Sequence, residues 1–564
     1  MRLLPFFGID LGTTNTVIAS SYKDRANLID SRVINFKQKT RDSSFNRIGH
    51  LPSVIFFDNN NKIIIGDFAK HIRGSQPNRV IFNSKRFMGT SSEWCIANYS
   101  FNARDAATEI LKICKDTILQ MFGISSPKDL PIVITHPASF NTDQSADTKN
   151  AAINAGFDPD KITLLHEPVA ALIDFVNTQT NQNELYRKID FWTKKRVMVY
   201  DLGGGTCDVC IVDVELKEKD KIDFVEIGTG RYSEFGGSDF DECCATFLLN
   251  NFLKDNKIKE RQITDSEINI MKNKLNLFCE EAKEYFSNEF QIYGYDESKV
   301  DSFEKNISEF YLDQYAPFSL TKKKFDLATD KLYYAPKKIN RDYIDKLSDK
   351  NIETPIIDTI RKYNIDINSI DFIYMTGGMT QYQKIQKRVM EIIDKQVIIA
   401  EDPISSIAKG ASIYGHFMVS QEKNSQKYVA TEKNDEIFHQ IKLVSILAES
   451  IMMDVANGLP IEIISKNQKL PFEGIMENIF KVASPSGIKI DIYAGEDVYD
   501  SKMRVQRSYS KRLDIPVIIG TPMDVEFKID KNKNLELKAI IKGDFNQEIP
   551  LYCESLDVQT NEIL

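Results

Sequence analysis

Residues 200–209 read YDLGGGTCDV and place three consecutive glycines between two aspartates, in a chain where only 26 of 564 residues are glycine. The apolar run RVMV precedes this stretch, and the alternating segment VCIVDVEL lies at its far end. The pattern predicts two strands joined by a tight turn at residues 203–205, where glycine permits positive φ and lets another group approach the backbone closely. A simple hairpin turn with a solvated aspartate at each end explains this stretch equally well when it is read alone.

The residues around these glycines add chemistry to the turn. Thr206 supplies a hydroxyl, and Asp201 and Asp208 supply carboxylates that can hold a divalent cation through its water molecules. Exposed backbone amides, a hydroxyl and a nearby Mg²⁺ suit a polyphosphate. The functional interpretation of the turn is therefore a phosphate-binding loop.

The N-terminal segment FFGIDLGTTNTVIAS, residues 6–20, has the same design of strand, turn and strand. Its turn carries Asp10, Gly12, Thr13, Thr14 and Asn15. Two copies of one motif are less expected by chance than a single copy, so we interpret them as an internal duplication. The two hairpins are predicted to hold opposite ends of one triphosphate and its metal ion.

A third glycine-rich turn lies in IDFIYMTGGMTQYQKIQKRVMEII, residues 370–393, where a buried strand runs through Thr376 into Gly377 and Gly378 and a helix follows. Glycines at this place let a flat group or a phosphate pack against the backbone. A turn that merely saves space is an equally good explanation of this segment alone.

Apolar residues recur three and four positions apart in the segments 103–123, 142–157, 168–178 and 267–287, which predicts amphipathic helices. For the second of these, Thr142 is the expected N-cap and Gly156 the expected stop. Strands that alternate with helices indicate an α/β domain over residues 1–418. Residues 419–443 are predicted to be a linker, residues 444–550 an all-β module of sandwich type, and residues 551–564 a tail.

Composition excludes several classes of function. The net charge of −9 gives no reason to expect binding to nucleic acid or to an anionic membrane. The N-terminus lacks a signal-peptide cleavage pattern, and no apolar run is long enough to span a bilayer. The eight cysteines are scattered, and the pair Cys207 and Cys210 has no partner pair at zinc spacing. We therefore expect reduced thiols and a cytoplasmic location.

Taken in order, six segments of the chain resemble the 70-kDa heat-shock protein chaperones: GIDLGTTN, NSKRFMG, LLHEPVAALI, YDLGGGTCDV, FGGSDFD and TGGMTQYQKIQ. The segments NQKLP, IDIYAGE and VEFKIDKNKNLELKA resemble the β domain of that family more loosely. The resemblance covers nearly the whole chain. It implies a two-lobed, duplicated, actin-like α/β ATPase domain followed by a small β-sandwich that binds peptides.

The resemblance also assigns roles to single residues. Asp10 and Asp201 would hold Mg²⁺ through water, Thr13 and Thr206 would face the γ-phosphate, and Lys85 would be the catalytic lysine. The implied catalytic group is Asp10, Lys85, Glu167, Asp201 and Thr206. The implied nucleotide-binding group is Gly12, Thr13, Thr14, Asn15, Gly203, Gly204, Gly205, Asp208, Gly236, Gly237, Glu280, Lys283, Ser287, Gly377 and Gly378. Pro137 would relay the nucleotide state between domains, and Ile451 and Ile488 would contact peptide.

Three departures from the family pattern fall on the nucleoside side of the implied site. Glu284 stands where an arginine usually lies against adenine, Met379 stands where a serine is usual, and Ile404 stands where an acidic residue is usual. We expect hydrolysis to be preserved and nucleotide affinity to be weakened or altered. In the linker, Gln440 and Lys442 interrupt the apolar run, which puts interdomain coupling in doubt. Helical-lid sequence is not expected after the β module, and Asp454 falls near an apolar wall position.

The leading hypothesis is an ATP-dependent chaperone that couples ATP·Mg²⁺ hydrolysis to binding of extended apolar polypeptide segments. K⁺ is a further candidate cofactor, and a J-domain co-chaperone and a nucleotide-exchange factor are the implied partners of an expected monomer. The alternative is an ATP-switched binding module with one dedicated partner. A small-molecule kinase or an actin-like filament protein leaves the β module without a role.

Overall fold

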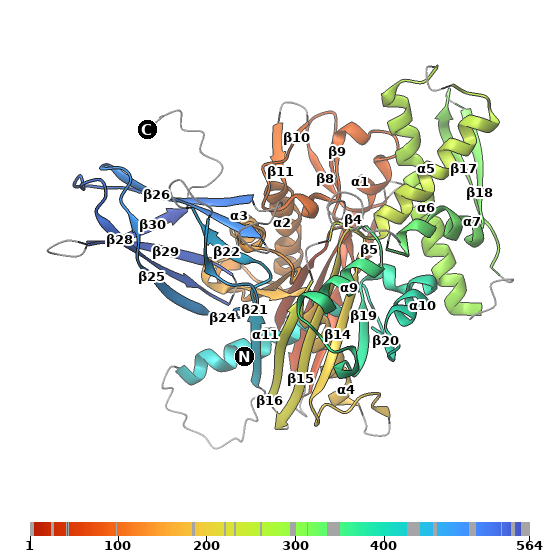
Figure 1. The fold of residues 1–564 in the computed structure, drawn as a ribbon. Coiled ribbons are helices and arrows are strands. Elements are labelled where there is room, and N and C mark those ends of the chain that lie inside the picture. Colours follow the sequence, from red (N-terminus) through yellow and green to blue (C-terminus); the bar gives the residue numbers. More distant parts are fainter. Residues whose placement is uncertain are drawn as a thin grey trace.

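The computed structural model of the protein is a mixed α/β structure with several sheets (Figure 1). It describes residues 5–23, 28–40, 42, 44–96, 99–182, 186–218, 221–230, 233–259, 262–293, 300–312, 314–335, 350–425, 440–454, 460–495, 504–531, 533–542 and 547–553. Parts of the predicted linker (residues 426–439) and of the predicted tail (residues 554–564) therefore lie outside the described residues.

Two central sheets share one strand order, which supports the internal duplication. The first has the order β13-β12-β1-β2-β3, with β6 also paired to β2, and the second begins β20-β19-β14-β15-β16. In each sheet the first three strands of this order are parallel to one another. The third strand forms a hairpin with the fourth, and the fifth pairs antiparallel with the fourth. The strands of the first sheet are β1 Phe6–Leu11, β2 Asn15–Lys23, β3 Ile29–Ile34, β6 Leu51–Pro52, β12 Ile132–His136 and β13 Ile162–His166. Those of the second are β14 Lys195–Leu202, β15 Cys207–Glu218, β16 Lys221–Thr229, β19 Phe372–Thr376 and β20 Val397–Ile399.

Both glycine-rich motifs form the predicted hairpins. Asp10 lies opposite Val17 in the β1–β2 pair, and Asp201 lies opposite Asp208 in the β14–β15 pair. The second turn closes through the amide of Gly203, which donates to the carbonyl oxygen of Thr206 at 3.0 Å. Each hairpin thus brings an aspartate to the end of a buried strand, beside its polar turn.

Helices cover the sheets, and the four predicted helical segments are helical. The α-helices are α1 Asp67–Ile72, α2 Ala103–Phe122, α3 Thr142–Asn154, α4 Glu167–Asn181, α5 Gly237–Asp255, α6 Asp265–Tyr293, α7 Lys322–Ala328, α9 Glu353–Lys362, α10 Gln383–Ile392 and α11 Ser406–Ser425. The predicted N-cap of α3 is wrong by one residue. Asn141 caps the helix, because its side-chain oxygen accepts hydrogen bonds from the amides of Asp143 and Gln144. Gly156 follows the helix end with φ +97°.

Helices α4 and α11, which follow the last parallel strand of each sheet, pack against each other. Gly410 makes this contact close, since a Cβ atom there would lie 1.7 Å from the carbonyl oxygen of Ala170. We expect Gly410→Ala to lower the free energy of unfolding by about 3 kcal/mol, because backbone on the facing helix must move to admit the methyl group. Thermal denaturation measures this change, and an unaltered melting temperature contradicts the packing described.

The second sheet is extended by a strand from the predicted linker. Strand β21 Gln440–Ile446 pairs in parallel with β16, and β24 Lys469–Leu470 pairs with β21. Ile441 is 3% exposed, whereas the neighbouring Lys442 points to solvent. Alternation along the strand therefore lets Lys442 interrupt the apolar run without disturbing the packed face. Helix α11 continues to Ser425, beyond the predicted domain end at residue 418.

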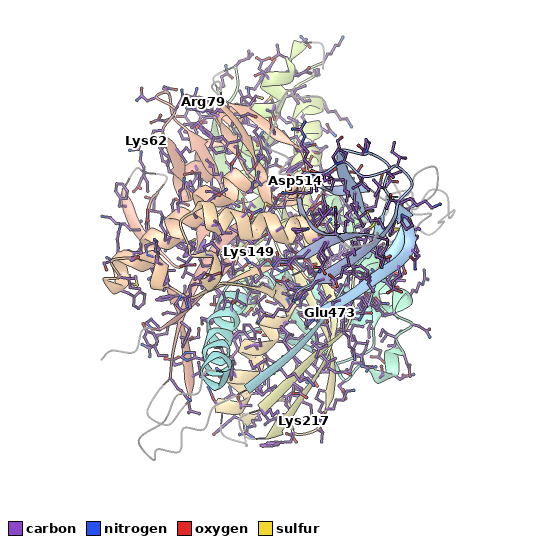
Figure 2. All side chains as sticks on the ribbon, turned by 90° about the vertical axis from the view of Figure 1, so that its left-hand side faces the viewer. Lys62, Arg79, Lys149, Lys217, Glu473 and Asp514 are labelled. Carbon is purple, nitrogen blue, oxygen red and sulfur yellow. The ribbon has the colours of Figure 1, made fainter. Side chains whose placement is uncertain are left out.

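Beyond β21 the described chain is made of strands alone, as the sequence pattern predicts. One path of eight strands, β23-β22-β26-β27-β30-β29-β28-β25, surrounds a single apolar core. These strands are β22 Ser450–Met453, β23 Ile461–Ile464, β25 Phe472–Lys481, β26 Gly487–Gly495, β27 Arg504–Arg512, β28 Pro522–Ile529, β29 Leu535–Ile541 and β30 Gln547–Cys553. We call this region the C-terminal domain; Figure 2 faces it and labels Glu473 on β25 and Asp514 in the loop after β27.

The remaining strands form small sheets outside the two central ones. They are β4 Phe36–Lys39, β5 Phe45–Ile48, β7 Ile55–Phe57, β8 Ile63–Ile65, β9 Val80–Ile81, β10 Glu93–Ile96, β11 Tyr99–Asn102, β17 Phe303–Tyr311 and β18 Gln314–Leu320.

Among the helices that the structure describes, none is long and apolar enough to span a membrane. Seven of the eight cysteines are free thiols, namely Cys95, Cys114, Cys207, Cys210, Cys243, Cys244 and Cys279.

Candidate functional site

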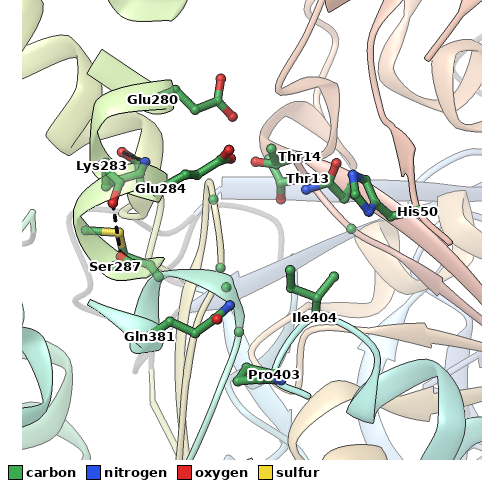
Figure 3. A pocket seen from close by; sticks show the side chains of 18 of the residues that line it. Thr13, Thr14, His50, Glu280, Lys283, Glu284, Ser287, Gln381, Pro403 and Ile404 are labelled. Carbon is green, nitrogen blue, oxygen red and sulfur yellow. Dashed lines mark hydrogen bonds between the residues drawn. The ribbon is translucent and has the colours of Figure 1, made fainter. Parts of the chain in front are cut away.

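A cavity of about 570 Å³ lies where the two duplicated hairpins meet. In Figure 3, Thr13 and Thr14 face it from one side, α6 from the opposite side, and Gln381, Pro403 and Ile404 from below. All the predicted catalytic residues line this cavity, and so do the predicted nucleotide-binding residues other than Gly205, Asp208 and Gly236. Those three adjoin the lining: a Cβ on Gly236 would lie 2.5 Å from the amide nitrogen of Gly205, and Asp208 lies opposite Asp201 in the β14–β15 pair.

The two hairpin turns form one end of the cavity. The side-chain oxygens of Thr13 and Thr14 are buried and have no hydrogen-bond partner among the described residues. Gly204 approaches them closely, because a Cβ on it would lie 1.8 Å from the hydroxyl oxygen of Thr14. Buried hydroxyls without partners are rare in folded proteins, so these two point to a ligand with strong hydrogen-bond acceptors.

Lys85 reaches the same end of the cavity from the 3₁₀ turn Ser84–Phe87. Its ammonium is 2.5 Å from a carboxylate oxygen of Glu167, the first residue of α4, and both side chains are buried. Burial opposes the charged form of Lys85, but the charges of Glu167 and Asp10 raise its pKa above the ordinary value. Lys85 is therefore a fixed positive charge beside the hairpins.

Carboxylates outnumber cations around Lys85. Burial raises the pKa of Asp10 to about 7, and Glu167 adds to the shift. Burial and Glu167 likewise raise the pKa of Asp208 to about 7 and that of Asp201 well above its usual range. A divalent cation between Asp10 and Asp201 would relieve this repulsion, so these residues fit Mg²⁺. Within the described residues no three potential ligands are grouped for direct binding of a metal ion.

The other end of the cavity is lined by α6. Glu280 forms an ion pair of 2.9 Å with Lys70, which crosses the cleft, and Lys283 forms one of 2.7 Å with Asp241. Burial would raise the pKa of Glu280, but Lys70, Arg73 and Lys283 lower it to about 2. The hydroxyl of Ser287 donates to the carbonyl oxygen of Lys283 at 3.0 Å (Figure 3).

The three departures noted in the sequence, Glu284, Met379 and Ile404, all line this second end of the cavity. Figure 3 shows the Glu284 carboxylate pointing from α6 across the cleft toward the threonines. Burial raises the pKa of Glu284, although Lys70 opposes the shift. Glu284 therefore adds a carboxyl group to the lining at this end of the cavity.

Sequence reasoning missed three residues that organise the site. Arg86 donates to the carbonyl oxygen of Gly205 at 2.8 Å and pairs with Asp239 at 2.6 Å, which ties the first half of the cleft to the second. Ser139 donates its hydroxyl to Asp208, and Lys70 pairs with Glu280. Of these three residues, only Arg86 could have been found from the sequence, because it directly follows Lys85.

The remaining predicted residues lie away from the cavity. Pro137 begins the loop between β12 and α3, and Nδ1 of His136 donates a hydrogen bond to the Pro137 carbonyl oxygen at 3.0 Å. Ile451 on β22 and Ile488 on β26 are 2% and 6% exposed, and both belong to the core of the C-terminal domain. Asp454 is exposed after β22.

Comparisons with known proteins agree over nearly the whole chain. A family model described as "Hsp70 protein" matches residues 6–103, 94–314 and 318–555. The chain is 25% identical over 538 residues to the Chaperone protein DnaK of Ureaplasma urealyticum serovar 10, which covers 94% of this chain and 76% of the relative. It is 27% identical over 541 residues to the Chaperone protein DnaK of Thermosipho africanus, covering 94% and 77%, respectively. It is 23% identical over 571 residues to the Heat shock 70 kDa protein of Emericella nidulans, covering 96% and 76%.

Proposed function

Because the chain belongs to the Hsp70 family, we propose that it is an ATP-dependent molecular chaperone that couples ATP hydrolysis to binding of extended apolar polypeptide segments. The two central sheets form the two lobes of an actin-like ATPase domain, and the C-terminal domain is a β-sandwich that binds peptide. The strand order common to both sheets supports the two-lobed fold. Domain limits near residues 418, 443 and 550 remain part of this proposal.

The observation that carries the ATPase proposal is the convergence of both hairpin turns on Lys85. Two buried, unpartnered threonine hydroxyls and a run of glycine amides face one fixed ammonium. This arrangement suits the triphosphate end of a nucleotide. Negative charge that develops on the γ-phosphate in the transition state would be stabilised by Lys85, and Thr13 and Thr206 would orient that group.

Mg²⁺ is the cation that Asp10 and Asp201 would hold through water, with K⁺ as a further candidate. When bound, Mg²⁺ neutralises charge on the phosphate oxygens. Glu167, whose carboxylate is buried beside Lys85, would be the carboxylate near the metal ion and the attacking water. At the other end, Glu280, Lys283 and Ser287 would contact the nucleoside.

The docked strand β21 supports coupling between the domains. It joins the ATPase sheet to β24 of the C-terminal domain, and Lys362 donates to the carbonyl oxygen of Ala448 at 2.7 Å across the same junction. Ile451 and Ile488 are the proposed peptide contacts, reached when the core around them opens. A J-domain co-chaperone, an exchange factor, a monomeric state and a cytoplasmic location belong to the proposal by family likeness.

A second candidate is an ATP-switched module with one dedicated partner. The observation that favours it is an exposed apolar loop after β27, in which Ile515, Ile518 and Ile519 are 65%, 83% and 64% exposed. Single exposed apolar residues are ordinary, but a cluster on one loop is typical of a surface for a specific partner.

Peptide binding separates the two candidates. Fluorescence anisotropy with a panel of labelled short apolar peptides, in ADP and in ATP, is the direct test. A chaperone should bind several unrelated peptides, and ATP should change their dissociation rates by about tenfold or more. Binding of no peptide in either nucleotide would favour the dedicated-partner module.

We expect Glu284→Arg to raise the affinity for ATP by about fivefold to tenfold, because it replaces a carboxylate facing the nucleotide with a cation that can lie against the base. Isothermal titration calorimetry measures the change. Glu289→Arg is the matched control, since Glu289 is on the same helix and does not line the cavity. Equal affinity in the two variants would contradict the placement of the nucleoside.

A further inference from the structure

Lys533, in the turn between β28 and β29, is buried in the ATPase domain. The side chain is 1% exposed, and its ammonium donates hydrogen bonds to the carbonyl oxygens of Ala138 and Phe140, each at 2.9 Å. These two residues belong to the loop between β12 and α3. Lysine is almost never fully buried without a specific partner, so this contact between domains has a defined geometry.

The backbone of the turn is shaped to place this side chain. Lys533 has φ +63°, a left-handed conformation that residues other than glycine and asparagine seldom adopt. Its amide donates to the carbonyl oxygen of Asp530 at 3.1 Å, and Asn534 bonds the carboxylate of Asp530 through both its amide and its side chain. Because glycine fits this conformation more easily, the lysine is present for its side chain.

Titratable groups from several elements surround the ammonium. They are Glu226 on β16, Glu449 between β21 and β22, Asp208 and Cys210 on β15, and His136 on β12. One carboxylate oxygen of Glu226 also lies 2.5 Å from Nδ1 of His166. The other accepts a hydrogen bond from the amide of Ile446 on β21 at 3.1 Å. The same carboxylate therefore faces both Lys533 and the docked linker strand.

A short series of contacts leads from Lys533 to the nucleotide site. Ser139 lies between Ala138 and Phe140, whose carbonyl oxygens accept hydrogen bonds from Lys533. The hydroxyl of Ser139 donates a hydrogen bond to the carboxylate of Asp208. Asp208 is paired with Asp201 across the β14–β15 hairpin. The ring of Phe140 lies 5.9 Å from the ammonium of Lys85. Movement of this loop would thus shift groups beside the catalytic lysine.

We propose that Lys533 is a positioning residue through which the C-terminal domain, when docked, fixes the loop at residues 137–141 and thereby sets the geometry of the nucleotide site. When the domain separates, Lys533 withdraws and the loop loses two hydrogen bonds at once. The inference rests on the proposed function, because it names how that same site is regulated.

Lys533→Gly is the main test, since glycine accepts the left-handed backbone and removes only the side chain. Two buried carbonyl oxygens then lose their donors. Hydrogen–deuterium exchange of the β21 amides, with and without ATP, reports the ratio of docked to separated molecules. We expect that ratio to fall at least about tenfold in Lys533→Gly and in Lys533→Met, and to stay at the wild-type value in the exposed control Lys528→Met.

A pH profile separates positioning by the amino group, which has N–H donors for both carbonyl oxygens even when it is neutral, from mere packing. Burial lowers the pKa of Lys533 to about 8, against the attraction of Glu226. The docked state therefore binds this proton more weakly than the separated state, and docking strengthens as pH rises through about 8. We expect the docked ratio of the wild type to rise about tenfold between pH 7 and pH 9, and that of Lys533→Met to show no such rise.

Single-turnover ATP hydrolysis supplies the functional readout. Lys533→Gly should change the hydrolysis rate of the full chain at least threefold at saturating ATP. The inference is overturned if Lys533→Gly shows the same docked ratio, the same pH profile and the same hydrolysis rate as the wild type. If the wild type itself binds no ATP, the proposed function fails, while the exchange experiment without nucleotide still decides whether Lys533 holds the domains together.

Discussion

Lys85→Ala is expected to lower the single-turnover rate of ATP hydrolysis by about a hundredfold or more, while ATP still binds. Among the described residues, Lys85 is the one that places a cation at the hairpin end of the cavity. Its ammonium is buried there beside Glu167. Its loss removes stabilisation that the γ-phosphate requires mainly in the transition state. Quenched-flow measurement of phosphate release gives the rate, and calorimetry gives the affinity.

Removing Lys85 also leaves Glu167 buried without its partner, so stability must be measured alongside activity. Lys85→Met keeps the aliphatic part of the side chain and serves as the second variant. Lys62→Ala, at an exposed position, is the control for loss of one positive charge. If Lys85→Met folds, binds ATP and retains more than a third of the wild-type rate, Lys85 is not the catalytic lysine.

Ile441→Asp is expected to separate the C-terminal domain from the ATPase domain. Ile441 is 3% exposed, lies opposite Ile222 in the β16–β21 pair and belongs to the core shared with β14 and β15. An aspartate there is an unpaired buried carboxylate, which disfavours docking by about 3 kcal/mol, or roughly a hundredfold in the docked ratio. Small-angle X-ray scattering should show a larger radius of gyration.

Lys442→Asp is the matched control, because Lys442 is on the same strand and faces solvent. We expect it to leave the radius of gyration and the hydrolysis rate unchanged. Separation of the domains in both variants would mean that β21 is held by charge and not by its apolar face. Separation in neither would mean that the β16–β21 pairing contributes little to docking.

Local patterns predicted the parts of the site that lie in short segments. Each hairpin motif contains its own strands, glycines and aspartate, so the shape of the turn follows from ten or fifteen residues. The duplication also predicted that the two turns would face one another, and Thr14 indeed lies against Gly204. Lys85 and Glu167 were assigned by family likeness, and their ion pair appears only in the fold.

Contacts between distant segments could not be read from those patterns. Lys70 reaches Glu280, and Lys533 reaches Ala138, only because several elements pack in one arrangement. The linker shows the same limit: Lys442 interrupts its apolar run, which put interdomain coupling in doubt, yet alternation along β21 turns Lys442 outward and Ile441 inward. The N-cap of α3 shifted from Thr142 to Asn141 because either residue type can cap, and the hydrogen bonds decide.

The most direct test of coupled hydrolysis is the single-turnover ATPase rate with and without a saturating apolar peptide, in the wild type and in Ile441→Asp. We predict that peptide raises the wild-type rate at least about fivefold and leaves the rate of Ile441→Asp unchanged, because the signal passes through the docked strand. A wild-type protein that hydrolyses ATP at one rate, with or without any peptide that it binds, would contradict coupling between the two domains.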